Sequence, residues 1–293
     1  MRSLTIFFCA TLYLIALVLS GCSTPSERSY RQAAKLGFVG DVVMARGFKH
    51  QIYRNRPSLA LRKSVLHVYL AGDGRPWLRS TVIAEDPTSR APLVLKLMAK
   101  DEQPSLYLGR PCYHGFYASP SCHPSLWTGA RYSETVVASM TGVLAQIITA
   151  EQIAGVTIFG YSGGGTLAVL LAARIPETLA VVTVAGNLDI DAWAEYHGYT
   201  PLTGSINPVK STALNPAIEQ LHLVGEEDGN ILKQFVTAFT SKQRNSRLLE
   251  VAEYDHGCCW PQVWPQVLAW SGAVESGKAP PSEGDDSVFV LPQ

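Results

Sequence analysis

A serine flanked by glycines lies between two apolar segments of this chain. The turn Gly160–Gly164 (Gly-Tyr-Ser-Gly-Gly) follows the run 156–159 and precedes the run 166–174. The first run predicts a buried strand and the second a buried helix, which places Ser162 at their junction. Glycines let the strand and the helix approach without Cβ clashes, and a strained turn presents the hydroxyl for attack. The pattern matches the G-x-S-x-G turn of a nucleophilic serine in its required context.

Strands and helices alternate along the segment that must position Ser162. This alternation predicts a mostly parallel sheet covered by helices. The strands are expected at about 42–45 and 49–53 (an opening hairpin), 64–71, 105–109, 156–159, 179–185, 220–224 and 247–252. The helices are expected at about 91–101, 131–150, 163–174, 230–241 and 260–270.

With the serine turn and these elements, the chain resembles the α/β-hydrolase family over nearly all of its folded part. The resemblance implies an α/β-hydrolase fold, with a mostly parallel central sheet flanked by helices. Only the segment 186–215 separates the strand 179–185 from the next strand region, so the cap is expected to be small. No metal and no organic cofactor is implied.

A serine hydroxyl needs a base to take its proton, and the base needs a third group to hold its tautomer. In the family that the chain resembles, the order along the sequence is serine, acid, histidine. Of the seven histidines, only His197, His222 and His256 follow Ser162. His222 alternates inside an apolar strand and His197 lies in an aromatic segment, whereas His256 follows the last strand. His256 is therefore the expected base.

The expected acid is Asp228, four positions after Val224 at the carboxyl end of a strand, where α/β sites assemble. Asp189, after the preceding strand, is the second candidate. Asp255 adjoins the histidine, but neighbouring side chains in an extended turn point apart, so it is expected to be a loop residue.

Two backbone N–H groups are expected to stabilise the oxyanion that develops during attack. One is the N–H of Gly163 at the start of the helix. The other is the N–H of Asp73, because the turn 70–74 (Leu-Ala-Gly-Asp-Gly) resembles the family's His-Gly-x loop with Ala71 in the histidine position. An ordinary glycine-rich turn is the alternative.

The N-terminus is expected to direct export. An uncharged stretch, 4–19, follows Arg2, and 19–22 (Leu-Ser-Gly-Cys) resembles the lipobox of bacterial lipoproteins, which makes Cys22 the acylated first residue. A plain signal anchor is the alternative, because the apolar run approaches the ~18 residues of a membrane span. Ser23 favours the outer membrane if the cell is Gram-negative. The predicted organisation is a signal peptide at 1–21, a tether at 22–36, a hydrolase domain at 37–271 and a disordered tail at 272–293.

Four cysteines remain after Cys9 is removed with the signal and Cys22 is assigned to lipid. An even number in an oxidising compartment predicts disulfides among Cys112, Cys122, Cys258 and Cys259, and three pairings are possible. A metal site formed by Cys112 and Cys122 with two histidines, His114 and His123, is an alternative, although its spacing fits no common zinc pattern.

Charge excludes one class of partner. The 24 basic and 24 acidic residues balance, so the chain has no electrostatic footprint for nucleic acid. The sequence predicts a lipid-anchored serine hydrolase of the bacterial cell envelope that cleaves a small-molecule ester, thioester or amide. A small-peptide hydrolase of the same fold, or a binding or scaffolding lipoprotein without turnover, are the alternatives.

Overall fold

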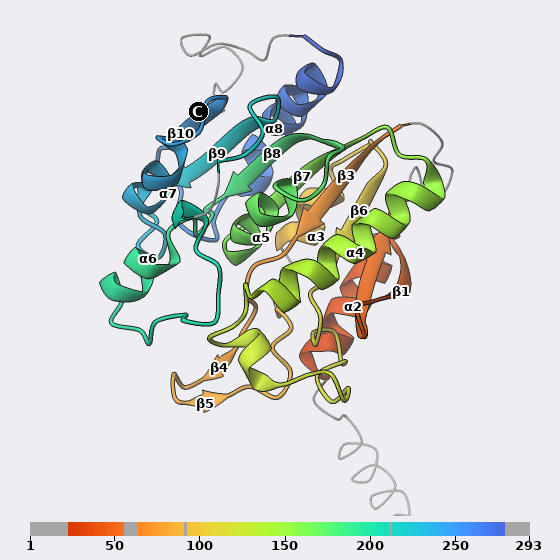
Figure 1. Cartoon of the computed structure of the whole chain (residues 1–293), viewed down its shortest axis with the longest axis vertical. Coiled ribbons are helices and arrows are strands. Elements are labelled where there is room, and N and C mark those ends of the chain that lie inside the picture. Colours follow the sequence, from red (N-terminus) through yellow and green to blue (C-terminus); the bar gives the residue numbers. More distant parts are fainter. Residues whose placement is uncertain (1–22, 56–63, 91–92, 211–212, 279–293) are drawn as a thin grey trace, which may run out of the picture.

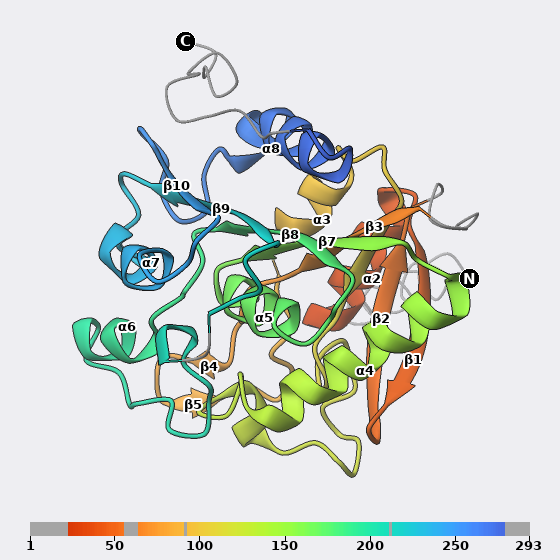
Figure 2. The same cartoon turned by 45° about the horizontal axis from the view of Figure 1, so that its top comes forward.

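An eight-stranded sheet crosses the molecule in the order β1-β2-β6-β3-β7-β8-β9-β10 (Figures 1 and 2). The computed structural model describes residues 23–55, 64–90, 93–210 and 213–278. β1 and β2 form an antiparallel hairpin, β2 is antiparallel to β6, and all other neighbours are parallel. The strands are β1 (Val39–Ala45), β2 (Phe48–Arg54), β3 (Val65–Leu70), β6 (Ser105–Leu108), β7 (Gly155–Tyr161), β8 (Thr178–Val184), β9 (Glu219–Gly225) and β10 (Ser246–Val251).

Helices cover both faces of this sheet, so that its central strands are almost entirely buried and mostly apolar. One face packs against α4 (Glu134–Glu151), α5 (Gly163–Ala172) and α7 (Lys233–Thr240), and the other against α2 (Pro25–Lys35), α3 (Leu93–Met98) and α8 (Trp260–Glu275). Figure 2 shows α4 and α5 on one side of the sheet and α3 and α8 on the other. The predicted fold class, a mostly parallel sheet flanked by helices, is confirmed.

The segment expected to be a tether is part of the folded domain. Residues 25–35 form α2, whose N-cap Thr24 and third residue Glu27 make a reciprocal capping box. Ser26 donates from its backbone N–H and its hydroxyl to Asp86, at 3.0 and 2.7 Å. These hydrogen bonds hold α2 against the loop 84–90, so the domain begins near residue 24 rather than residue 37. The predicted signal peptide and Cys22 lie outside the described residues.

The other end of the domain also extends further than expected. α8 continues to Glu275, beyond the predicted boundary at residue 271, because Glu275 is bound to the sheet. Its carboxylate accepts hydrogen bonds from His67 of β3 and Thr157 of β7, at 2.7 and 2.6 Å. Only 279–293 of the predicted tail lies outside the described residues.

Short elements surround the carboxyl ends of the parallel strands. The cap between β8 and β9 is small, as expected, and contains α6 (Ile190–Tyr196) and the 3₁₀ turn η3 (Pro208–Lys210). Two elements without a counterpart in the sequence prediction are the hairpin β4–β5 (Trp77–Leu78 and Val82–Ile83) and the 3₁₀ turn η2 (Pro124–Trp127). No helix in the described part of the chain combines the length and the apolar character that a bilayer span needs.

A buried ionic cluster joins α8, β3 and the end of α3. His67 donates from Nδ1 to Asp101 at 2.6 Å and from Nε2 to Glu275 at 2.7 Å, and Tyr69 donates its hydroxyl to the same Asp101 oxygen. Burial alone would lower the pKa of His67, but the hydrogen bonds and charges of the two carboxylates outweigh it and raise that pKa to about 9. The imidazolium form therefore links the three elements at neutral pH.

This cluster predicts a stability that declines with alkalinity. The pKa of His67 is raised from 6.5 to about 9 in the folded chain, so its contribution is complete below pH 6.5 and is lost as the pH rises through about 9. The urea midpoint of the wild type is expected to fall over this range, and that of a His67→Gln variant to fall less. Parallel pH profiles of the two proteins would contradict the charged form of His67.

Candidate active site

Ser162 lies on a strained turn between β7 and α5. Its backbone angles, φ 53° and ψ −123°, are unusual for a residue with a side chain, and they point the hydroxyl away from both elements. Glycines make this turn possible. A Cβ on Gly160 would come 2.2 Å from the carbonyl oxygen of Gly164, and a Cβ on Gly164 would come 2.3 Å from that of Leu70. Strand, helix and the loop after β3 therefore meet with their backbones in contact.

The structure brings together the three side chains that the sequence singled out. Ser162 donates its hydroxyl to Nε2 of His256 at 3.0 Å, and His256 donates from Nδ1 to Asp228 Oδ2 at 2.8 Å. The Asp228 side chain is fully buried, whereas about a quarter of the His256 side chain is exposed. With the proton on Nδ1, the free Nε2 lone pair faces the serine hydroxyl, which is the tautomer that a general base needs.

Asp228 is held by the loop that follows β9. Its Oδ1 accepts the N–H groups of Asn230 and Ile231, both at 2.8 Å, so that Oδ2 remains for His256. These bonds fix the carboxylate without help from solvent. The second acid candidate, Asp189, instead caps α6 through the N–H of Ala192.

The rejected histidines have other contacts. His222 is buried in β9, where its Nδ1 lies 2.8 Å from the Thr183 hydroxyl and burial lowers its pKa to about 3. His197 lies beside α6 and bonds through Nε2 to the carbonyl oxygen of Asn230 at 2.9 Å. Asp255 is exposed and accepts the N–H groups of its own turn, as expected for a loop residue.

Asn230 is a site residue that sequence reasoning missed. Its Nδ2 lies 3.2 Å from His256 Nε2, and its Oδ1 accepts the indole N–H of Trp193 at 3.2 Å. Asn230 therefore links the cap to His256, and its amide approaches the same ring nitrogen, Nε2, that the Ser162 hydroxyl contacts. Its place two residues after Asp228 was the available signal, but an asparagine in a turn is common for local reasons alone.

The loop after β3 lies directly beside the serine. A Cβ on Gly72 would come 3.2 Å from the Cβ of Ser162, and a Cβ on Gly163 would collide with the Asp73 carboxylate. Neither the N–H of Asp73 nor that of Gly163 donates to any described residue. Both groups thus remain free next to the serine hydroxyl, in the neighbourhood expected for an oxyanion site.

The Asp73 carboxylate, which packs against Gly163, lies in a cluster of positive charge. Arg110 and Arg131 each contact it at 2.8 Å, and the Tyr132 hydroxyl donates to it at 2.6 Å. Burial alone would raise the pKa of Asp73, but the two guanidinium charges and the Tyr132 hydrogen bond hold it below its usual range. Tyr113 donates to the Asp73 carbonyl oxygen at 3.0 Å. The acidic side chain therefore fixes the loop and does not oppose a nearby oxyanion.

Ser162 and His256 open into a cavity of about 980 Å³. This volume lies at the upper end of the usual range for small-ligand sites. One wall is apolar and comes from α3, the cap and the loop after β9; it includes Leu93, Val94, Leu95, Trp193, Leu202 and Ile231. The site therefore combines a serine hydroxyl that is hydrogen-bonded to a histidine with room for a large apolar group.

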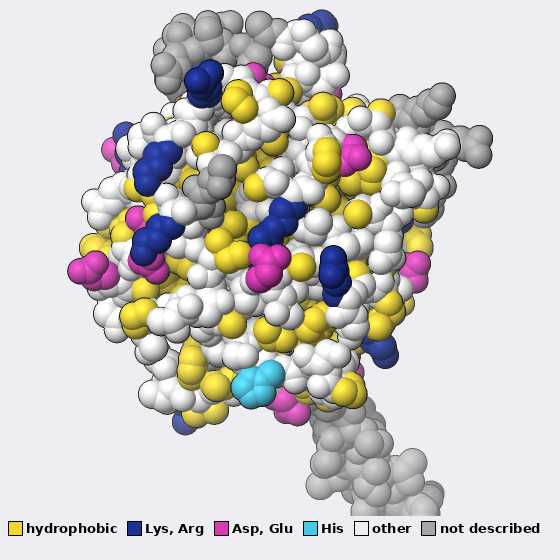
Figure 3. Space-filling view, in the orientation of Figure 1, with side chains coloured by type: hydrophobic (Ala, Val, Ile, Leu, Met, Phe, Trp, Pro, Cys, Tyr) yellow, Lys and Arg dark blue, Asp and Glu magenta, His cyan; other side chains and the backbone are white. Residues whose placement is uncertain are grey.

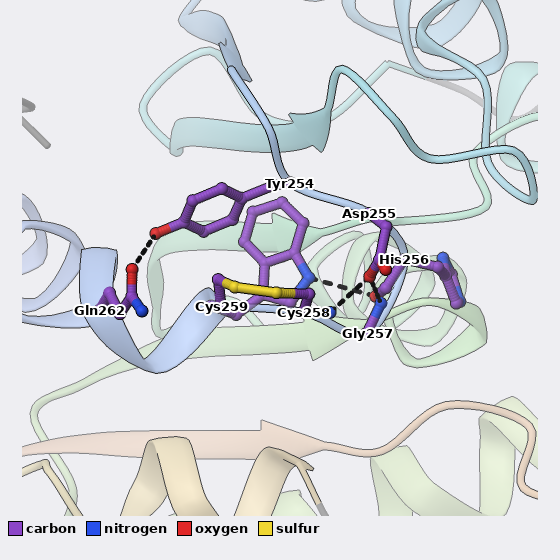
Figure 4. The surroundings of a disulfide bond; sticks show 8 residues. Tyr254, Asp255, His256, Gly257, Cys258, Cys259 and Gln262 are labelled. Atoms are coloured by element: carbon purple, nitrogen blue, oxygen red, sulfur yellow. Dashed lines mark hydrogen bonds between the residues drawn. A yellow bond between two sulfur atoms is a disulfide. The ribbon is translucent and has the colours of Figure 1, made fainter. Parts of the chain in front are cut away.

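The four cysteines form two disulfides, Cys112–Cys122 and Cys258–Cys259. The first confirms one of the possible pairings and removes the alternative metal site, because both sulfur atoms are bonded to each other. No cluster of possible metal ligands occurs among the described residues. The second joins neighbours two and three residues after His256 (Figure 4).

The loop of His256 is held at both ends. Tyr161 and Trp260 donate to the His256 carbonyl oxygen at 3.0 and 3.1 Å, and Asp255 accepts the N–H groups of Gly257 and Cys258. Cys259 then caps α8 with a positive φ of 73°. The disulfide closes the short segment between the histidine and the helix.

Comparison with solved structures identifies the fold. Est1E of Butyrivibrio proteoclasticus, solved with ferulic acid bound, matches with a TM-score of 0.60 and 12% identity over 81% of this chain and all of its own. A membrane phospholipase A matches with a TM-score of 0.57 and 14% identity over 94% of this chain and 99% of its own. A candidate lipase from Acinetobacter baumannii AYE matches with a TM-score of 0.57 and 12% identity over 89% of this chain and all of its own.

The chain therefore has the α/β-hydrolase fold, with the sheet order and crossing helices described above. No protein-family model and no curated protein matches its sequence. The fold hosts many reactions, so the chemistry must come from the site.

Removal of the Asp73 charge is expected to damage both stability and chemistry. An Asp73→Asn variant leaves two buried guanidinium groups without their carboxylate, which costs about 3–5 kcal/mol when a buried pair is broken. Urea unfolding measures this loss of stability. The rate of ester hydrolysis, measured at a low temperature at which the variant stays folded, reports the effect of displacing the loop after β3. An Asp41→Asn variant, altered at an exposed carboxylate on β1 away from the site, is the matched control. Equal stability of the two variants would contradict the role given to Asp73.

Loss of the Cys258–Cys259 disulfide is expected to loosen the His256 loop. In a variant with Cys258→Ser and Cys259→Ser, the histidine is held only by its hydrogen bonds, so we expect a lower kcat with little change in KM. Steady-state kinetics and amide hydrogen exchange at 255–260 measure the effect. Replacing Cys112 and Cys122 in the same way provides the comparison, and unchanged kcat and exchange in the first variant would show that the disulfide does not brace the loop.

Proposed function

We propose that this protein is a serine hydrolase that cleaves a carboxylic ester through an acyl-enzyme on Ser162. The observation that carries the proposal is the chain of two hydrogen bonds from Ser162 through His256 to Asp228, at 3.0 and 2.8 Å, at the wall of the cavity. This arrangement supplies a nucleophile, a base and a group that orients the base.

The reaction proceeds in two balanced halves. Ser162 Oγ attacks the ester carbonyl carbon while its proton passes to His256 Nε2, and the carbonyl oxygen becomes an oxyanion. The intermediate collapses, the carbon–oxygen bond to the alcohol breaks, and His256 returns the proton to the leaving alkoxide. Water then repeats the sequence against the acyl-enzyme and releases the acid.

Charge stabilisation in both halves comes from groups already in place. Asp228 is buried and hydrogen-bonded to His256, so its carboxylate favours the imidazolium that forms during attack. The free N–H groups of Gly163 and Asp73 are the proposed oxyanion donors. Because backbone donors are fixed before reaction, they need no rearrangement in the transition state.

The cavity favours an ester with a bulky apolar acyl group. Its apolar wall runs from α3 to the cap, and its volume exceeds what a short acyl group fills. Esterases and lipases among the structural neighbours support the same substrate class, since Est1E was solved with ferulic acid and another neighbour is a phospholipase A.

We also propose that the protein is a lipoprotein of the bacterial cell envelope, anchored through lipid on Cys22. The support is the Leu-Ser-Gly-Cys sequence after an apolar stretch, together with two disulfides, which suit an oxidising compartment. More than one acyl chain on Cys22 would hold the chain firmly on a bilayer.

A fluorophosphonate probe tests the proposed nucleophile. We expect it to label Ser162 alone, and we expect Ser162→Ala to lose labelling and at least about 10⁴-fold of ester hydrolysis. Asp228→Asn should lower kcat by about 10⁴-fold because it favours the wrong histidine tautomer, whereas the matched Asp189→Asn should change only the cap of α6. Mass spectrometry of the labelled peptide and steady-state kinetics provide the readouts.

Three results would contradict this proposal or favour an alternative function. Folded protein that takes no label would favour a binding lipoprotein without turnover. Labelled protein that hydrolyses small peptides but no ester would favour the peptide hydrolase. Equal loss in the two aspartate variants would remove Asp228 from its proposed role.

A further inference from the structure

Exposed apolar side chains surround the mouth of the cavity. On the β4–β5 hairpin, Trp77, Val82 and Ile83 are 38%, 56% and 41% exposed, and on the cap side Tyr196 and Tyr199 are 57% and 52% exposed. We call these five residues the mouth rim. The loop that follows α6 runs beside the hairpin in both cartoon views.

The mouth rim frames the cavity and extends beyond it. Trp77 and Tyr199 line the cavity, so its opening lies between the hairpin and the cap. Val82 and Ile83 do not line it, and they project from a two-stranded element whose turn carries Arg79. In Figure 3, hydrophobic side chains appear at the end of the molecule where Figure 1 shows β4 and β5. An ester bound inside the cavity would therefore not contact Val82 or Ile83, and another partner is needed to cover them.

The proposed anchor residue, Cys22, is joined to the domain at α2, which is hydrogen-bonded to the loop that follows the hairpin. Cys22 precedes Ser26 by four residues, so the two Cα atoms lie at most about 14 Å apart. Ser26 is hydrogen-bonded to Asp86, which follows Ile83 by only three residues, a reach of at most about 11 Å. The chain between Cys22 and the hairpin is therefore short enough for acyl chains on Cys22 and the hairpin side chains to reach the same bilayer surface.

From this placement we propose that the mouth rim docks onto the surface of the bilayer that holds the anchor. Val82, Ile83 and Trp77 enter the boundary between headgroups and acyl chains, Tyr196 and Tyr199 lie at headgroup level, and the cavity opens directly onto lipid. Amphipathic aromatic side chains suit that level, and apolar ones gain from leaving water. The proposed substrate is then an ester of a membrane lipid or of another acyl compound dissolved in the bilayer. This inference rests on the proposed hydrolase activity and the proposed anchor.

The depth of the hairpin in a bilayer tests docking without any turnover. The acylated chain is reconstituted in vesicles of phosphatidylethanolamine and phosphatidylglycerol, with a nitroxide at Val82→Cys. Disulfides or lipid occupy the four mature-domain cysteines and Cys22, so the introduced thiol is the one labelled. The matched control is a nitroxide at Ala154→Cys, an exposed position at the opposite end of β7 from Ser162.

We expect oxygen to relax the label at position 82 more than a water-soluble nickel complex does, and the reverse at position 154. Equal access of the nickel complex to both labels on vesicle-bound protein would overturn the docking. Protein that fails to stay on the vesicles would overturn it as well, together with the proposed anchor. Neither result bears on fluorophosphonate labelling of Ser162, so failure of the hydrolase is recognised separately.

Substrate choice gives the second readout. A variant with Val82→Ser and Ile83→Ser is expected to hydrolyse a lipid ester in vesicles about tenfold more slowly or worse, with unchanged hydrolysis of a short soluble ester. Val39→Ser with Val42→Ser, altered at similarly exposed valines on β1, should keep both activities. Equal loss on both substrates, or no loss on vesicles, would show that the mouth rim does not serve lipid docking.

Discussion

The arrangement of the site depends on the close contact of three backbone segments around Ser162. β7, α5 and the loop after β3 approach so tightly that glycines must occupy the contact positions, and this crowding imposes the unusual backbone of the serine. Because side-chain atoms have no room there, the hydroxyl has one direction in which to point, toward His256. The same contact brings the loop that carries Asp73 against the start of α5. Geometry of this kind is set by folding and does not have to be assembled when substrate arrives.

Two buried ionic clusters brace the ends of this arrangement. Asp73, compensated by Arg110 and Arg131, fixes the loop beside the serine, while His67, compensated by Asp101 and Glu275, joins β3 to α8. Buried ion pairs contribute little net stability compared with apolar packing, yet loss of one partner is costly. Their value here is positional, since each cluster specifies where a loop or helix end must lie.

Strand–helix alternation predicted the sheet and its helices. The choice of Ser162, Asp228 and His256 also needed the resemblance to the α/β-hydrolase family, whose order of serine, acid and histidine pointed to them, and the structure brings these three side chains together. Other features depend on partners distant in sequence. Thr24, Pro25 and Glu27 carry a helix-start signal, but the polar composition of α2 concealed that Ser26 is bound to Asp86. From the sequence alone, the Asp73 side chain looks like an ordinary carboxylate in a turn. Its partners Arg131 and Tyr132 come 58 and 59 residues later, and only the fold places them beside it. Asn230 acquires its role only after the cap supplies Trp193.

The bond between His67 and Glu275 spans 208 residues of sequence. During synthesis, β3 becomes available long before α8 does, and the charged imidazole of His67 then lacks one of its two carboxylates. Contacts of such long range form late and slow the overall folding reaction. The chain therefore cannot complete this part of its buried core until residue 275 has emerged, which delays the assembly of β3 with α8 and of the site beside them.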